Sequence, residues 1–116
     1  MAVTACQSTS PLDSVSPRDA MTKVARQAQA CWFGANKQNF ANYRLASEVS
    51  SYAGRPRVLI VPKNNPEGLP KLVVQAERRS GTTEVSVFGP LLDGKDGPLL
   101  EQQARAWAAG AKNCTA

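Results

Sequence analysis

The spacing of apolar residues changes twice along this chain of 116 residues, and the two changes restrict its fold. Over residues 17–32, apolar side chains recur every three or four positions, which is typical of a helix with one buried face. Over residues 40–88 the period becomes two, which indicates strands. A second helical stripe follows at 100–111. The sequence therefore predicts a helix, then strands, then a helix.

Local signals mark where both helices begin. Ser16 is a typical N-cap residue, and Pro17 suits the first helical position because its missing N–H has no helical partner there. In the second helix the cap is Asp96 or Gly97, with Pro98 at the first position. These signals place a folded domain at 17–116.

Four strands are expected between the helices. They lie at 43–50, 57–61, 71–77 and 83–88, separated by turn-forming segments rich in Gly, Pro, Asn and Ser. Short connections favour antiparallel neighbours. We predict an α+β fold: a helix, a four-stranded antiparallel meander and a helix, with both helices on one face of the sheet.

The two middle strands carry apolar side chains on both faces. Since helices cover only one face, the second should present an apolar strip that needs a cover. The cover is a dimer partner, a target protein or the N-terminal tail; alternatively, long Arg and Lys stems shield the strip. The residues concerned are Val58, Leu59, Ile60, Val61, Leu72, Val73 and Val74.

The first 16 residues show no apolar periodicity and are predicted to be disordered. Within them, Val3-Thr4-Ala5-Cys6 resembles a bacterial lipobox, position by position. The resemblance implies that Cys6 carries lipid and that the following Ser/Thr-rich segment tethers the domain to a bacterial membrane, on its periplasmic side.

With Cys6 assigned to the lipid, Cys31 and Cys114 remain. One falls in the last turn of the first helix and the other just beyond the second, so their positions are compatible with a disulfide between helix ends. That bond would make the helices roughly parallel neighbours, with Trp32 and Trp107 near their contact. A disulfide implies an oxidising compartment. The alternative is a cytosolic protein with three unrelated thiols.

Catalytic signals are weak in this sequence. There is no histidine, which removes the commonest general base and the commonest metal ligand. The glutamates show no motif spacing, and no serine lies in a nucleophile motif. We expect no enzyme, no metal and no cofactor; the alternative is an enzyme with a carboxylate-based site. The longest apolar runs are too short to span a bilayer.

The net charge of +5 favours anionic partners. Antiparallel pairing of the middle strands should gather Arg55, Arg57, Arg78 and Arg79 at one end of a hairpin. This Arg cluster is a candidate contact for an anionic envelope component or an acidic protein; alternatively, it is a solvated sheet edge. Nucleic acid is not expected, because no aromatic residues alternate with the basic ones.

Leu69, between Gly68 and Pro70 in loop 62–70, is a candidate exposed apolar tip that could insert into another protein. The alternative is that its side chain folds back onto the sheet.

Together these features predict a periplasmic lipoprotein that is a non-catalytic protein-binding or envelope accessory module. It would bind an envelope protein or form a homodimer through the second sheet face. The alternative is a periplasmic inhibitor or immunity-type protein that blocks an enzyme with loop 62–70 and the Arg cluster.

Overall fold

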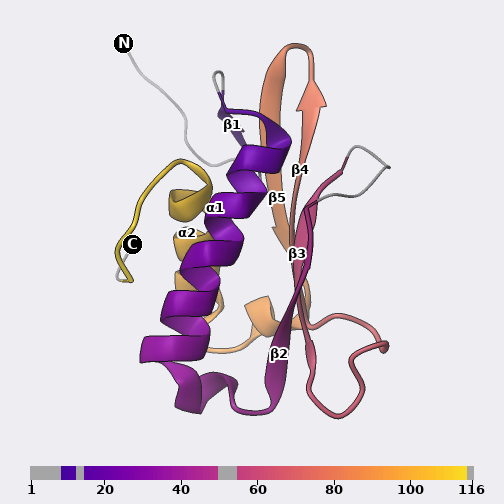
Figure 1. Ribbon diagram of the computed structural model, residues 1–116, viewed down its shortest axis with the longest axis vertical. Helices are drawn as coiled ribbons and strands as arrows, with labels where there is room; N and C mark the ends of the chain where they lie inside the picture. The colour runs from indigo at the N-terminus through magenta and orange to yellow at the C-terminus, as the bar shows by residue number, and fades with distance from the viewer. Residues whose placement is uncertain (1–8, 13–14, 50–54, 115–116) are drawn as a thin grey trace.

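A five-stranded antiparallel sheet, with two helices packed on one of its faces, makes up the described part of the chain, residues 9–12, 15–49 and 55–114 of the computed structural model (Figure 1). The strand order is β1-β5-β4-β3-β2. The elements are β1 Thr9–Leu12, α1 Pro17–Ala30, η1 Cys31–Ala35, η2 Lys37–Phe40, β2 Tyr43–Glu48, β3 Arg57–Pro62, β4 Leu72–Arg79, β5 Thr82–Phe88, η3 Pro90–Asp93 and α2 Gly97–Ala108. The predicted α+β order of helix, four-strand meander and helix is confirmed.

Helix α1 begins where its cap predicts. The Ser16 hydroxyl accepts a hydrogen bond from the Asp19 N–H at 3.1 Å, and Pro17 occupies the first turn. After Ala30 the chain makes one wide π-helical turn, in which the Asn36 N–H donates to the Cys31 carbonyl at 2.8 Å. This turn keeps Cys31 and its neighbour Trp32 buried, so the apolar stripe continues past the end of α1.

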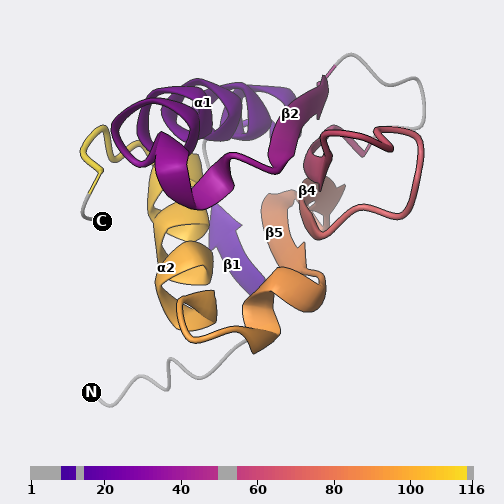
Figure 2. The same cartoon turned by 90° about the horizontal axis from the view of Figure 1, so that it is seen from below.

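The meander aligns two sets of apolar side chains. On the helix side, Val58 lies opposite Val74 and Ile60 opposite Leu72, and all four pack under α1 and α2 in the main core. The alternate residues of β3 and β4 point to the other face, which no described helix covers (Figure 2). The helices thus cover the sheet on one side only.

The prediction that residues 1–16 are disordered is wrong for residues 9–12. These residues form β1, which pairs with β5 from Thr9 opposite Ser86 to Leu12 opposite Thr83. Strand pairing uses backbone groups, so a segment without apolar periodicity can still complete a sheet edge. The Thr83 hydroxyl also donates to the Val15 carbonyl, which holds the chain between β1 and α1.

The prediction that the two helices run roughly parallel is also wrong. In Figure 1, α1 descends from its N-terminus while α2 rises, so the helices are closer to antiparallel. Beyond α2 the chain turns at Gly110, whose φ is +114°, and returns alongside the helix. The disulfide therefore joins the end of α1 to this returning segment and not to the end of α2.

Candidate binding surfaces

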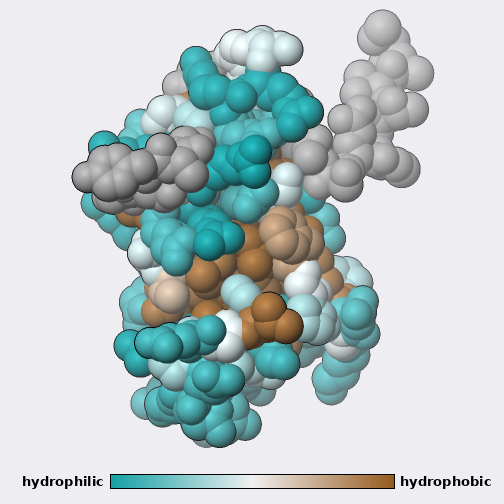
Figure 3. Space-filling model, turned by 90° about the vertical axis from the view of Figure 1, so that its right-hand side faces the viewer, coloured by the Kyte–Doolittle hydropathy of each residue, from teal (hydrophilic) through white to brown (hydrophobic). Residues whose placement is uncertain are grey.

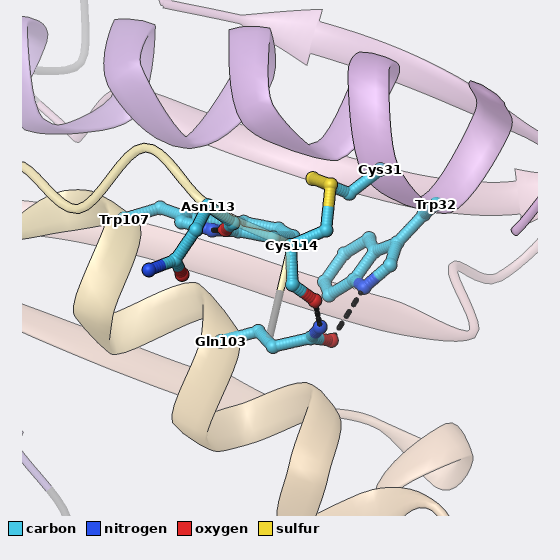
Figure 4. Close-up of a disulfide and its surroundings, with 6 residues drawn as sticks. All are labelled: Cys31, Trp32, Gln103, Trp107, Asn113 and Cys114. Carbon is cyan, nitrogen blue, oxygen red and sulfur yellow. Dashed lines mark hydrogen bonds between the residues drawn. A yellow bond between two sulfur atoms is a disulfide. The ribbon is translucent and has the colours of Figure 1, made fainter. Parts of the chain in front are cut away.

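The disulfide between Cys31 and Cys114 is present, with their Cα atoms 5.4 Å apart (Figure 4). Next to it, the amide of Gln103 accepts a hydrogen bond from Nε1 of Trp32 at 2.8 Å and donates one to the Cys114 carbonyl at 2.6 Å. Four residues later on α2, Nε1 of Trp107 donates to the carbonyl of Asn113 at 2.8 Å. These bonds fix the returning C-terminal segment along α2.

The two tryptophans lie at the helix contact, as predicted. Their ring centroids are 5.1 Å apart, and Phe40 stacks on Trp32 with the ring centroids 5.5 Å apart. Both indoles are fully buried, with their N–H groups satisfied by the bonds given above. Aromatic packing and polar satisfaction therefore make this end of the core rigid.

A pocket of about 430 Å³ opens beside this aromatic cluster. Its walls come from two segments that are distant in sequence, η1 with η2 and η3 with the start of α2. Trp32, Phe40, Leu91, Leu99 and Leu100 supply apolar lining, and Asn36, Asn39, Lys95 and Asp96 supply polar lining. The volume suits a small apolar ligand or one apolar side chain of a partner. No spacing in the sequence predicts it, because the walls meet only through the tertiary fold.

The second face of the sheet carries the predicted apolar strip. Strand register places Ala46, Leu59, Val73 and Phe88 side by side across β2, β3, β4 and β5. We call these four residues the apolar row. Leu59 and Val73 are buried in a second small core with Val61, whereas Phe88 is 45% exposed. Figure 3 shows apolar side chains gathered in a shallow hollow on this face, with polar groups above and below.

The Arg cluster divides between the two faces. Arg57 lies opposite Gln75, and by strand alternation Arg79 shares that second face. Arg78 points to the helix face, where Nη1 donates to the Thr83 hydroxyl at 3.2 Å. The four guanidinium groups thus share one end of the sheet, but they do not form a single site.

Three of these arginines are paired with carboxylates. Arg57 bonds Glu48 at 2.7 Å, and Glu77 binds both Arg79, at 2.6 Å, and Arg55, at 3.1 Å. The hydrogen bond from Arg79 and the nearby positive charges hold the pKa of Glu77 below its usual value. This end of the second face is therefore a mixed ion network, which weakens the case for a dedicated anion site.

Leu69 is 86% exposed at the end of the β3–β4 loop, so the alternative in which it folds back onto the sheet is wrong.

The candidate lipidation site, Cys6, lies outside the described residues. Across the described ranges, no group of three or more His, Cys, Asp or Glu residues could hold a metal ion. Nor does any helix in those ranges have the length and apolar character to cross a bilayer.

No protein-family model matches the chain, and comparisons with curated proteins and with solved structures find no similar protein. Function is therefore inferred from the surfaces described above.

Proposed function

We propose that this chain is the disulfide-stapled domain of a bacterial lipoprotein that works without catalysis, by binding another protein of the cell envelope. Lipid on Cys6 would anchor it on the periplasmic side of a membrane. The apolar row on the second sheet face is the proposed contact surface.

Two features support export. The disulfide links residues 83 positions apart, and such bonds persist in oxidising compartments, whereas cytosolic thiols are kept reduced. The lipobox-like sequence ending at Cys6 accounts for the third cysteine, which has no partner in the chain once the other two are bonded. Export and anchorage therefore account for all three cysteines together.

The observation that carries the binding proposal is the exposed end of the apolar row. Phe88 is 45% exposed, on a face that no described helix covers, and it ends a row whose other members are buried or half-buried. Exposed apolar patches rimmed by polar groups commonly mark protein contacts. The ion network beside the row would supply a polar rim, as protein interfaces usually have.

Site-specific photo-crosslinking in bacterial cells tests this surface. A photoreactive residue at Ser86, next to Phe88 on the same face, should capture one discrete partner, and Phe88→Glu in the same chain should abolish that product. The same residue placed at the exposed Gln29 on α1 is the matched control and should capture nothing specific. Equal products from both positions, or a product that survives Phe88→Glu, would contradict the proposal.

A second candidate, the inhibitor or immunity-type protein, is favoured by the exposure of Leu69 on its loop. An exposed leucine on a loop with two flanking prolines suits insertion into an enzyme cleft. Leu69→Asp separates the two proposals. It should leave the Ser86 crosslink intact if the sheet face is the contact, and abolish partner capture if the loop is.

A further inference from the structure

Strand β2 is an open edge of the sheet. Within the described residues it pairs with β3 alone, while the opposite edge of β5 is already covered by β1. β1 has four residues and includes Pro11, which cannot donate a hydrogen bond, so it is a poor template for a further strand. β2 has six residues and no proline. It is the edge on which another strand can add.

The hydrogen-bonding pattern shows which backbone groups point outward. The Lys63 N–H donates to the Asn42 carbonyl at 2.8 Å, which identifies Asn42 as bonded towards β3. In an antiparallel ladder, the residues of one strand point their backbone groups alternately towards the neighbouring strand and away from it. The even-numbered residues of β2 therefore bond to β3, and the odd-numbered ones direct their N–H and C=O groups away from it. The outward residues are Tyr43, Leu45 and Ser47.

We propose that two copies of this chain pair edge to edge through β2, antiparallel, with the two-fold axis between their Ala46 residues. In this register Leu45 of each copy faces Ser47 of the other. Both are outward residues, so they can exchange backbone hydrogen bonds as a closely spaced pair. The contact is isologous and closes after two copies.

Charge selects this register. It places Arg44 of each copy opposite Glu48 of the other, on the second face, and opposite charges across a strand pair are favourable. Shifting the register by two residues in either direction separates both pairs, because Arg44 then no longer faces Glu48 of the other copy. Within one copy, Glu48 binds Arg57 at 2.7 Å, and Arg44 forms no ion pair with any described residue. In the dimer, Glu48 of the second copy would supply a carboxylate partner for Arg44.

Pairing in this way also joins the two apolar rows. Ala46 ends the row in each copy, so the rows of both copies would meet at the axis and form one strip across the joint sheet. The small side chain of Ala46 avoids a steric clash at the axis, where the opposed Cβ atoms lie closest. The inference depends on β2 alone and stands apart from the proposed membrane attachment.

Ser47→Pro tests the backbone part of the proposal. Proline removes the outward N–H of residue 47 and leaves the bonds to β3 untouched. By sedimentation velocity the unlipidated protein should have twice the 12.4 kDa of one chain, and Ser47→Pro should have the mass of one chain. Ser47→Ala, which keeps the N–H, should stay dimeric. A wild-type monomer, or a Ser47→Pro dimer, would overturn the proposal.

A mixing experiment tests the register and does not depend on how proline is tolerated. Arg44→Glu and Glu48→Lys should each be monomeric, because each puts like charges opposite each other twice. Mixed in equal amounts, they should form a heterodimer, in which both pairs are again opposite in charge. Arg26→Glu on α1 is the matched charge control and should remain a dimer. A mixture that stays monomeric would contradict this register.

Discussion

Nε1 of Trp32 donates a hydrogen bond to Oε1 of Gln103 across 2.8 Å, between residues 71 positions apart. The other end of the same amide donates to the Cys114 carbonyl at 2.6 Å. One buried side chain thus connects η1, the middle of α2 and the C-terminal segment. This link keeps the disulfide beside the tryptophan cluster and forms part of the pocket wall.

Replacing Gln103 with leucine should lower the free energy of unfolding by about 2 kcal/mol. The reason is that the buried Trp32 N–H and the Cys114 carbonyl both lose their partner, while the volume of the side chain is nearly kept. Urea denaturation followed by tryptophan fluorescence measures the change. Gln29→Leu, on the exposed side of α1, is the control and should shift stability by less than about 0.5 kcal/mol. Equal shifts would show that the amide link is not stabilising.

Reduction of the disulfide should destabilise the domain strongly. Closing a loop of 83 residues contributes at most about 4.5 kcal/mol on chain-entropy grounds, and measured losses are commonly 2–5 kcal/mol. Urea midpoints with and without a reductant should therefore differ clearly, and a Cys6→Ser variant should show the same difference. If the reductant leaves the midpoint unchanged, the bond has no part in stability.

Gly97 should tolerate no side chain. A Cβ there would overlap the Leu92 carbonyl oxygen, which belongs to the backbone and cannot turn aside. Gly97→Ala should therefore cost about 2 kcal/mol or more and disturb the start of α2. Gly94→Ala, in the segment between η3 and α2, is the matched control, because its Cβ would lie 3.6 Å from the nearest atom, the Leu91 carbonyl oxygen. Thermal unfolding of the two variants decides between them, and equal melting temperatures would contradict the packing seen here.

The ion network should make stability depend on pH in the acid range. The hydrogen bond from Arg79 lowers the pKa of Glu77 in the folded chain below the unfolded value of 4.5. The ionised Glu77 therefore stabilises the fold fully above pH 4.5, and this stabilisation is lost as the pH falls from there through the folded pKa. The melting temperature of the wild type should therefore fall more steeply than that of Glu77→Gln between about pH 5 and pH 3. Glu67→Gln, in the exposed loop, should follow the wild type. If the melting temperatures of all three proteins fell equally with pH, Glu77 would not be the cause of the pH dependence.

The sequence was sufficient for the elements whose signals are local. The Ser16 cap and the alternation in β2 and β5 each depend on neighbouring residues, and the structure confirms them. The disulfide partners were also predicted. Their bond fixes where two Cα atoms meet, but not the path of the chain after α2. The turn at Gly110 reverses that path, and so the parallel arrangement of the helices was the wrong inference.

The surfaces were harder to predict because they depend on register and on side-chain partners. The unbroken apolar runs in β3 and β4 were enough to predict the apolar strip on the second face. It could not show that Glu48 and Glu77 would pair with the arginines, since that requires the cross-strand alignment. β1 was missed for a related reason: a strand that adds by its backbone to a sheet edge needs no apolar pattern.

Mass spectrometry of the protein purified from bacterial envelopes, alkylated without reduction, examines lipidation and the disulfide in one sample. We expect an N-terminal peptide that begins at a diacylated or triacylated Cys6, together with a disulfide-linked peptide pair containing Cys31 and Cys114. An unmodified Cys6 still preceded by Ala5, with Cys31 and Cys114 each carrying the alkylating group, would contradict this expectation.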